Sequence, residues 1–483
     1  MKILRDLIEE ALNLASVYGA GYADIRIEDL IHEHILVKNK QVENINYSQS
    51  SGFGIRVLLD GCWGFASSSI FSLEEVRKIV VQAITIARAS AMVKKNPAVL
   101  SHSPVIRDNY ISPYVIDPFL VPLADKLELL TTVNETMSVY PLIKVYGAEL
   151  NFFKHKKLFA SSEGSYIEQN YIKSGAGLQV WSIENNDMHT RSYPANSGGD
   201  FQTSGYEFVL GLKLNENAAR ICEEAVKLLE AEQCPSGEKT VIIDSNQMAI
   251  QIHESIGHPA EYDRVLGTEA SFAGTSFLTE EKLNKLKFGS DIVNVYADAT
   301  IPNALGSYLY DDEGIPSRRV PLVKEGLFVG YLTSRETATN LGQESSGAMK
   351  AENWNFLPLI RMPNINLEPG NWKLEDLIAD TEDGIYLCTN KSWSIDDKRW
   401  NFQFATEIAW EIKNGKLGKM YKNPTYTDNT VHFWNSCDAI CNSDYWHIWG
   451  IPNCGKGQPM QSGHVGHGAS PARFKNIRVG VLD

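Results

Sequence analysis

The alternation of apolar and polar residues predicts a helix, an antiparallel sheet and a second helix in the first part of the chain. Residues 3–18 carry apolar side chains at the spacing of one helical face. Apolar residues then alternate with polar ones in residues 25–37 and 55–59, and the second run leads into Asp60-Gly61, a strong hairpin signal. Residues 72–75 form a Ser-Leu-Glu-Glu capping box, so the helix that follows is expected to cover one face of the sheet.

The rest of the pattern predicts two domains. Residues 143–183 are strand-rich, residues 216–232 have helical spacing, and the Pro and Gly of residues 234–237 then interrupt the chain. We therefore predict an N-terminal α/β domain at residues 1–232, with an antiparallel sheet and covering helices, and a C-terminal β-rich domain at residues 233–483. In the second domain, short apolar runs between Gly, Asn and Asp predict a curved, largely antiparallel sheet, so the fold class is α+β.

The composition excludes several classes of protein. The 483 residues are 43% hydrophobic and 22% charged, which is the balance of a folded globular protein. A formal net charge of −14 argues against a nucleic acid partner. Acids interrupt the apolar pattern of the first residues and no hydrophobic run is long enough to span a membrane, so we expect a cytoplasmic protein without a membrane partner. Seven scattered cysteines, an odd number, do not predict a disulfide framework.

A His-Glu-x-x-x-His motif at residues 253–258 is the strongest chemical signal in the chain. It is one residue longer than the His-Glu-x-x-His motif of many zinc peptidases. On a regular helix, histidines four residues apart lie about 40° apart around the axis, whereas histidines five apart diverge by about 140°. Gly257 weakens the helix and Pro259 disfavours helical backbone at His258, so His258 can leave the helix end. A π-bulge would have the same effect.

This motif predicts a zinc site in which His253 and His258 are ligands and Glu254 is the general base. Zinc lowers the pKa of a bound water, and a carboxylate beside the first ligand can accept the proton of that water. The alternative is a chance pair of hydrogen-bonded, inert histidines on a surface helix. A catalytic zinc also needs a third protein ligand. The residues leave these candidates open: Glu261, Asp263, Cys454, His464 and His467.

The surroundings of these candidates differ in kind. Glu261 and Asp263 follow the motif so closely that they could equally orient an imidazole ring. Cys454 lies in the Gly-rich segment 453–457, where Lys456 would favour a thiolate, and such surroundings are unlike those of a core thiol. The spacing of Cys437 and Cys441, by contrast, fits no common zinc pattern, so we interpret both as ordinary thiols.

Several segments together resemble the TldD/PmbA family, also labelled modulators of DNA gyrase, and the TldD branch more closely. The segments that carry the resemblance are residues 253–258 with Glu261, Tyr310-Asp311-Asp312-Glu313-Gly314, Cys454-Gly455-Lys456-Gly457-Gln458, residues 60–66 and residues 235–237. The resemblance implies a zinc peptidase whose C-terminal domain carries the metal. It also implies His253, His258 and Cys454 as the metal ligands and Glu254 as the general base.

The resemblance has implications for partners and substrates as well. The family works as a dimer, often with a PmbA (TldE)-type subunit that lacks the metal motif, so we expect a homodimer or such a heterodimer. Its members degrade unfolded peptides or remove leader peptides, so unfolded or extended peptides are the expected substrates. The alternative is a non-enzymatic modulator that binds a topoisomerase or an antitoxin. The intact His253, Glu254 and His258 argue against that alternative, because a binding module does not need a base beside two ligands.

Two segments are left open by the resemblance. Residues 458–468 are longer than the compact ending of the best-described members, so a metal-binding role for His464 or His467 stays a hypothesis beside a plain loop role. The acids of Tyr310-Asp311-Asp312-Glu313-Gly314 are interpreted equally well as the lining of a cleft, as a cation site, or as a solvated turn.

Overall fold

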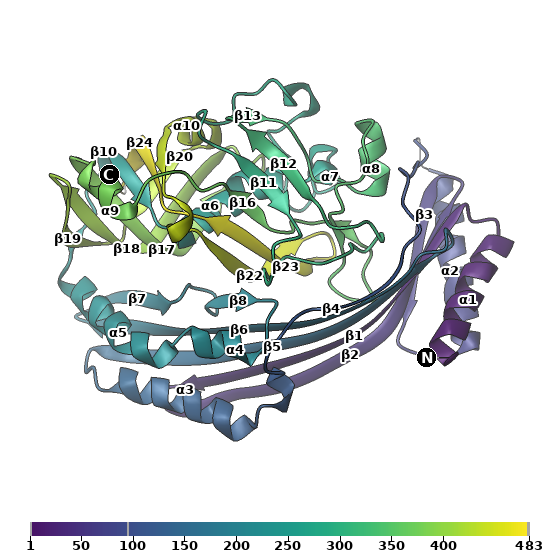
Figure 1. Cartoon of the computed structure of the whole chain (residues 1–483), viewed down its shortest axis with the longest axis horizontal. Coiled ribbons are helices and arrows are strands. Elements are labelled where there is room, and N and C mark those ends of the chain that lie inside the picture. The colour runs from purple at the N-terminus through teal and green to yellow at the C-terminus, as the bar shows by residue number, and fades with distance from the viewer. Residues whose placement is uncertain (1, 94–95, 481–483) are drawn as a thin grey trace.

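The computed structural model describes residues 2–93 and 96–480 and is built around two large sheets (Figure 1). The strands of the N-terminal sheet are β1 (Tyr22–Lys38), β2 (Gln41–Leu59), β3 (Cys62–Ser68), β4 (Arg107–Ile111), β5 (Ile143–Ser161), β6 (Tyr166–Glu184), β7 (Asp187–Tyr193) and β8 (Asp200–Gln202). Their order is β3-β2-β1-β5-β6-β4, with β7 and β8 paired to β6. The pairings of β1, β2, β5 and β6 are antiparallel, and only β4 runs parallel to its neighbour β6 within the described part of this sheet.

Helices cover the convex face of this sheet (Figure 1). They are α1 (Lys2–Val17), α2 (Leu73–Ala91), α3 (Leu123–Ser138), α4 (Tyr206–Gly211) and α5 (Leu214–Glu230), with a 3-10 turn, η1 (Pro118–Leu120), before α3. The helices predicted at residues 3–18, after residues 72–75 and at residues 216–232 are confirmed as α1, α2 and α5. No helix was predicted at α3, because Lys126 and Asn134 are buried on its inner face and interrupt the apolar periodicity.

Alternation along the long strands gives the sheet one apolar and one charged face. In β1, Ile25 and Ile35 belong to two separate apolar clusters under the helices. The side chains at the alternate positions of β1 point to the opposite, concave face of the sheet. The C-terminal part covers this face (Figure 1). There Arg56 of β2 donates hydrogen bonds to Asp24, at 2.7 Å, and to Glu313 of the C-terminal part, at 3.2 Å. The concave face is therefore a buried polar interface rather than an apolar one.

The second large sheet forms the core of the C-terminal part. Its strands are β9 (Glu232–Gln233), β10 (Gly237–Ile243), β17 (Asp383–Ile395), β18 (Asn401–Lys413), β19 (Lys416–Lys422), β20 (Thr425–Asn429), β21 (Cys437–Ile440) and β24 (Ala472–Val479). Their order is β17-β10-β24-β20-β18-β19-β9, with β21 paired to β24. Because β17 also pairs with β18, five of the strands curl into a closed circuit. This result confirms the predicted α+β fold class, with an antiparallel sheet and covering helices in the N-terminal part and a curved sheet in the C-terminal part.

Shorter elements complete the C-terminal part. The strands are β11 (Val295–Asp298), β12 (Arg319–Lys324), β13 (Leu327–Phe328), β14 (Met349–Lys350), β15 (Leu359–Ile360), β16 (Ile365–Leu367), β22 (His447–Lys456) and β23 (Gln461–Ala469). The helical elements are α6 (Ser245–Ile252), η2 (His253–Gly257), η3 (His258–Ala260), α7 (Tyr262–Val265), η4 (Glu280–Lys282), α8 (Arg335–Asn340), α9 (Leu374–Ala379), α10 (Thr430–Asn435) and η5 (Ser443–Tyr445). The predicted domain boundary between residues 232 and 233 falls within β9 and stays a prediction. Among the helices of the described residues, none has the length and apolar character needed to cross a membrane.

The hairpin of β22 and β23 links the two halves of the molecule. In Figure 1 it lies between the concave face of the N-terminal sheet and the rest of the C-terminal part. The carboxylate of Asp200 in β8 accepts hydrogen bonds from Nε2 of His447 and from the backbone N–H of Gly450, both at 2.8 Å. This connection fixes the start of the hairpin, and the hairpin carries Cys454.

Candidate metal centre

The motif histidines are brought to one side by a π-helical turn. Asp244 caps α6, because its side chain accepts a hydrogen bond from the backbone N–H of Gln247 at 2.8 Å. The helix then widens over η2, where the N–H of His258 bonds to the carbonyl oxygen of His253, five residues earlier. In a π-helix, residues five apart lie one above the other. The structure thus adopts the π-helical solution that the His-Glu-x-x-x-His spacing allowed, and the two rings lie 4.8 Å apart.

Gly257 and Pro259 have definite roles in this turn. A Cβ atom on Gly257 would lie 2.1 Å from Sδ of the buried Met362, so only glycine fits without displacing that side chain. Pro259 lies in the first turn of η3, where the missing N–H of proline costs no helical hydrogen bond. The close approach of Met362, rather than helix weakening alone, therefore accounts for the glycine.

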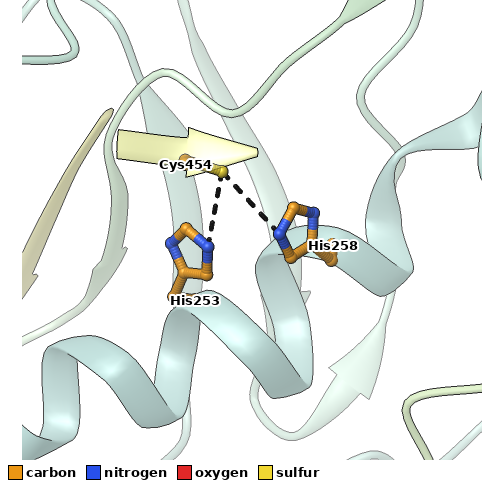
Figure 2. A group of neighbouring side chains, drawn as sticks. All are labelled: His253, His258 and Cys454. Atoms are coloured by element: carbon orange, nitrogen blue, oxygen red, sulfur yellow. Dashed lines mark hydrogen bonds between the residues drawn. The ribbon is translucent and has the colours of Figure 1, made fainter. Parts of the chain in front are cut away.

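His253, His258 and Cys454 converge on one point (Figure 2). Sγ of Cys454 lies 3.5 Å from Nε2 of His253 and 3.7 Å from Nε2 of His258. All three residues are buried, and their ligand atoms lie within 4.8 Å of one another. A tetrahedral zinc ion with ordinary bond lengths separates a sulfur from a nitrogen ligand by about 3.5 Å. The three side chains therefore form a group that can hold a metal ion with a fourth position free.

The charges around Cys454 favour the thiolate. Burial alone would raise the pKa of the Cys454 thiol, but His253, Arg361 and His258 together hold this pKa well below its usual range. Burial lowers the pKa of His258 well below its ordinary value. Burial also lowers the pKa of His253, but the negative charge of Cys454 outweighs that effect and raises it. A thiolate and a neutral imidazole are the forms in which cysteine and histidine bind metals.

Two further residues orient the imidazole rings. Nδ1 of His258 lies 2.9 Å from Oε2 of Glu261, which also lies 3.3 Å from Nζ of Lys456. Nδ1 of His253 lies 2.7 Å from Nε2 of His467. In both rings the Nδ1 atom is engaged and the Nε2 atom points to Cys454, as metal-ligating histidines require. Asp263 does not approach the group, because its carboxylate binds Lys456 at 2.7 and 2.9 Å.

Glu254 faces the same cavity and is held by an arginine. Its carboxylate oxygen Oε2 accepts a hydrogen bond from Nη1 of Arg399, which belongs to the turn between β17 and β18. The cavity has a volume of about 280 Å³, and its walls include Asn196, Trp393 and Trp449. The arrangement thus presents a carboxylate beside a group of potential metal ligands, in a space large enough for part of a peptide.

The remaining candidates lie outside the metal group. His464 lies 3.1 Å from Nζ of Lys173 in a different cavity. Cys437 and Cys441 are buried free thiols. The His253, His258 and Cys454 group is the one cluster of possible metal ligands found among residues 2–93 and 96–480. Arg399 was not predicted, because nothing in a hairpin turn distinguishes one cation from its neighbours, and His467 was predicted only as a ligand or a loop residue.

The acidic segment 310–314 forms a buried turn. One carboxylate oxygen of Asp311 accepts hydrogen bonds from the backbone N–H groups of Glu313 and Ile315, both at 2.9 Å. Asp312 pairs with Lys157, and Glu313 pairs with Arg56 at 3.2 Å. The turn therefore connects the two halves of the molecule through ion pairs, and it lies against a cavity rather than in open solvent.

Comparison with known families places the chain. A family model of the PmbA/TldA metallopeptidase C-terminal domain matches residues 236–481, and one of the PmbA/TldA metallopeptidase domain 1 matches residues 23–87. A metalloprotease of Methanocaldococcus jannaschii is 32% identical over 446 residues, 92% of this chain and 94% of the relative. A zinc metalloprotease TldD homolog of Saccharolobus solfataricus is 23% identical over 471 residues, 96% of this chain and 98% of the relative. The chain belongs to the PmbA/TldD family of metallopeptidases, and the resemblance read from its motifs is confirmed.

Solved structures share the fold. A protein from Thermotoga maritima described as a modulator of DNA gyrase superposes with a TM-score of 0.78 at 16% identity, over 99% of this chain and 100% of that one. TldE from Thermococcus kodakarensis gives a TM-score of 0.72 at 16% identity, over 98% and 100%. These likenesses confirm the architecture of both halves of the chain.

Proposed function

We propose that this protein is a zinc-dependent peptidase that hydrolyses unfolded or extended peptides, with His253, His258 and Cys454 as metal ligands and Glu254 as general base. The observation that carries the proposal is the convergence of two imidazoles and one thiolate beside a buried carboxylate. Structural zinc sites close with four protein ligands, whereas catalytic sites have three and an open position. The name of the Saccharolobus solfataricus relative, a zinc metalloprotease, agrees with zinc as the ion.

The residues around the ligands have distinct tasks in this proposal. Zinc in such a site would supply Lewis acidity, which activates water and polarises the carbonyl of a peptide bond. Glu254 takes the proton that the attacking water loses and passes it to the leaving amine. Arg399 holds one oxygen of that carboxylate, so the other oxygen is free to meet the proton. Glu261 and His467 keep the imidazole rings in the orientation that ligation needs.

The position of the site favours extended substrates. Strand β22 forms part of the wall of the metal cavity, and the walls come from both halves of the molecule, including Asn196 and Cys454. A folded domain cannot enter a space of about 280 Å³, whereas an extended segment can enter it and pair its backbone with a strand edge. Peptide turnover and leader-peptide removal both present such segments. We further propose that the protein acts as a homodimer or as a heterodimer with a PmbA (TldE)-type subunit, in keeping with the fold shared with TldE.

The proposal is tested by measuring bound zinc and peptide hydrolysis together. Wild-type protein, Cys454→Ala and Glu254→Gln are purified without added metal, and zinc per chain is measured by elemental analysis. Hydrolysis of an unstructured peptide is assayed for each protein alone and with a co-expressed TldE-type subunit, so that a missing partner is not mistaken for a missing activity.

We expect about one zinc per chain in the wild type and in Glu254→Gln, and much less in Cys454→Ala. Hydrolysis should be lost in both variants, because one lacks the metal and the other the base. If Glu254→Gln hydrolyses peptide as fast as wild type, or if wild type holds no zinc, the peptidase assignment fails. A non-enzymatic modulator that binds a topoisomerase or an antitoxin would then be the better account.

A further inference from the structure

A second, larger cavity adjoins the metal cavity. It has a volume of about 500 Å³ and lies between the concave face of the N-terminal sheet and the C-terminal part. Alternate residues of two strands, among them Lys157 of β5 and Lys173 of β6, line one wall. Pro452 and Asn453 of β22 line both cavities, and Cys454 follows them directly. A peptide held in the metal cavity can therefore extend into this second cavity.

Two lysines of this cavity have no carboxylate partner among the described residues. Nζ of Lys173 lies 3.1 Å from Nδ1 of His464, and the sheet around it offers no acid within ion-pair distance. Nζ of Lys350 donates to three backbone carbonyl oxygens, at 3.2 to 3.3 Å, and to no carboxylate. A cation removed from water without an anion destabilises the fold unless something else offsets it. Lys350 already uses its N–H groups on these carbonyl oxygens, and burial lowers its pKa well below the ordinary value, so Lys173 is the lysine left to meet a ligand.

Arg361 is a second basic side chain without an acid partner among the described residues. It is only 2% exposed, and its guanidinium donates to the backbone carbonyl oxygens of Cys454 and Gln461. No carboxylate lies within ion-pair distance in the described parts of the chain, and the Nε atom has no hydrogen-bond partner there. Arg361 lines the second cavity and touches the backbone of a proposed metal ligand. It therefore joins the lining of the second cavity to the strand that carries Cys454.

The acids of this cavity do not neutralise these cations. Asp312 pairs with Lys157 and lies 3.8 Å from Arg26. Asp311 is bonded to backbone N–H groups, and burial together with the charge of Glu313 raises its pKa to about 8, so it carries little negative charge near neutral pH. Glu352 accepts from the backbone N–H of Ser462 at 2.5 Å at the exposed rim. Arg361 and the charged form of Lys173 are therefore left without an acid partner among the described residues of this cavity.

We propose that this second cavity binds a carboxylate of the peptide substrate, and that Lys173 and Arg361 are the recognising groups. Charge-assisted hydrogen bonds from ammonium and guanidinium groups to a carboxylate are strong, and they are stronger when shielded from water. The carboxylate is either the C-terminus of the peptide or an Asp or Glu side chain near the bond that is cut. This inference rests on the proposed function only in taking a peptide as the ligand.

The chemistry of Lys173 supports this assignment. Burial, with a further contribution from Lys157, lowers the pKa of Lys173 to about 7. A lysine that is only partly charged when the cavity is free gains its full charge when a carboxylate enters. His155 and Tyr171 add further polar atoms to the same face of the cavity.

The test measures binding rather than hydrolysis, so it does not depend on activity. Four peptides of eight residues are labelled at the N-terminus, with a free or amidated C-terminus and with Glu or Gln at one internal position. Their affinities for zinc-loaded Glu254→Gln are measured by fluorescence anisotropy, in this background and with Lys173→Met, Lys173→Arg or Lys156→Met added. Lys156 is the matched control, because it is an exposed lysine of the same strand as Lys157 but outside the second cavity.

We expect one of the two carboxylates to tighten binding by about tenfold over its uncharged counterpart. The position that gives the preference identifies the source of the carboxylate as the C-terminus or a side chain. Lys173→Met should abolish the preference, whereas Lys173→Arg and Lys156→Met should keep it. The inference is overturned if all four peptides bind equally, if none binds, if the preference survives Lys173→Met, or if Lys156→Met removes it as well. Hydrolysis by the wild type without any carboxylate preference would reject this inference and leave the proposed function intact.

Discussion

Nδ1 of His253 lies 2.7 Å from Nε2 of His467, and this contact fixes where the protons of both rings are. Nδ1 of His467 lies 3.3 Å from the carbonyl oxygen of Ile365, which can only accept, so this nitrogen carries the proton. Nε2 of His467 is then the acceptor for the Nδ1 proton of His253. The lone pair of His253 is consequently on Nε2, the atom that lies 3.5 Å from Sγ of Cys454.

Replacing His467 should therefore weaken metal binding without removing a ligand. His467→Phe keeps the ring volume but loses the acceptor, so His253 can rotate or change tautomer, and we expect zinc affinity to fall by about 10- to 100-fold. His467→Gln keeps a hydrogen-bond acceptor, so its zinc affinity should fall by less. Competition with a chromogenic chelator measures both, with the exposed His432→Ala as control. A phenylalanine variant that binds zinc as tightly as wild type would show that the contact does not orient His253.

Replacing Arg399 should lower the rate of turnover and leave the zinc content unchanged. Its backbone has a φ of 64°, a left-handed conformation that asparagine tolerates well, so Arg399→Asn removes the guanidinium without straining the turn. With Glu254 released from its partner, we expect kcat to fall by about 10- to 100-fold, since general base catalysis contributes about 10²- to 10⁴-fold and only positioning is lost.

Steady-state kinetics and zinc analysis check this expectation together. The neighbouring Lys398→Asn removes the same charge from the same turn without a contact to Glu254, and it should retain wild-type kcat. An equal loss in both variants would mean that the net charge of the turn matters, and not the contact with Glu254. A loss of zinc in Arg399→Asn would instead mean that the turn supports the metal site as a whole.

The metal site was predicted from the sequence as far as its parts are local. His253, Glu254 and His258 lie within six residues, so spacing and helix geometry alone predicted a departure from a regular α-helix and offered the π-helical turn as one of two solutions. Cys454 is separated from His258 by 196 residues, and no periodicity carries information over that distance. Its proposed role as a metal ligand came from the family resemblance of residues 454–458. Arg399 offered no local signal, because its role depends on how β17 and β18 fold over α6.

The fold was predictable to a similar extent. Alternation in the N-terminal strands correctly predicted a sheet with one apolar face, because that face packs on helices. The same alternation could not reveal that the polar face is buried by the other half of the chain. Ion pairs such as that of Arg56 with Glu313, 257 residues apart, exist only once both halves are folded. The charged side of β1 therefore reads as solvent-exposed in the sequence and is an interface in the structure.

Gly257→Ala should destabilise the protein although alanine favours helix. The new Cβ would lie 2.1 Å from Sδ of Met362, and overpacking of a buried site costs about 1–3 kcal/mol. Met362→Ala alone should also destabilise, by leaving a cavity. The free energy of unfolding of the double variant should fall by less than the sum of the two single decreases, because the shortened side chain at residue 362 makes room for the methyl group. Urea unfolding of the four proteins measures the coupling, and strictly additive losses would show that Met362 is not the obstacle.

The affinity for a carboxylate-bearing peptide should depend on pH through Lys173. The pKa of Lys173 is lowered to about 7 by burial and by Lys157, so the amine is charged below about pH 7 and neutral above it. The groups facing it are Lys157, His464, Lys350 and the ring of Tyr171, and burial lowers the pKa of His464 well below its ordinary value, so His464 stays neutral in this range.

The ligand needs the charged lysine. The preferred peptide, with a free C-terminus or with Glu, should therefore bind Glu254→Gln about tenfold more tightly at pH 6 than at pH 8, because its binding takes up one proton over the pH unit above the pKa of Lys173. Its amide or Gln counterpart should bind equally at both values. Lys173→Arg is the decisive control, since a guanidinium stays charged throughout and should flatten the pH profile at the tight-binding level. If the arginine variant keeps the full pH dependence, the titrating group is another member of the cavity, and Lys350 is the next to replace.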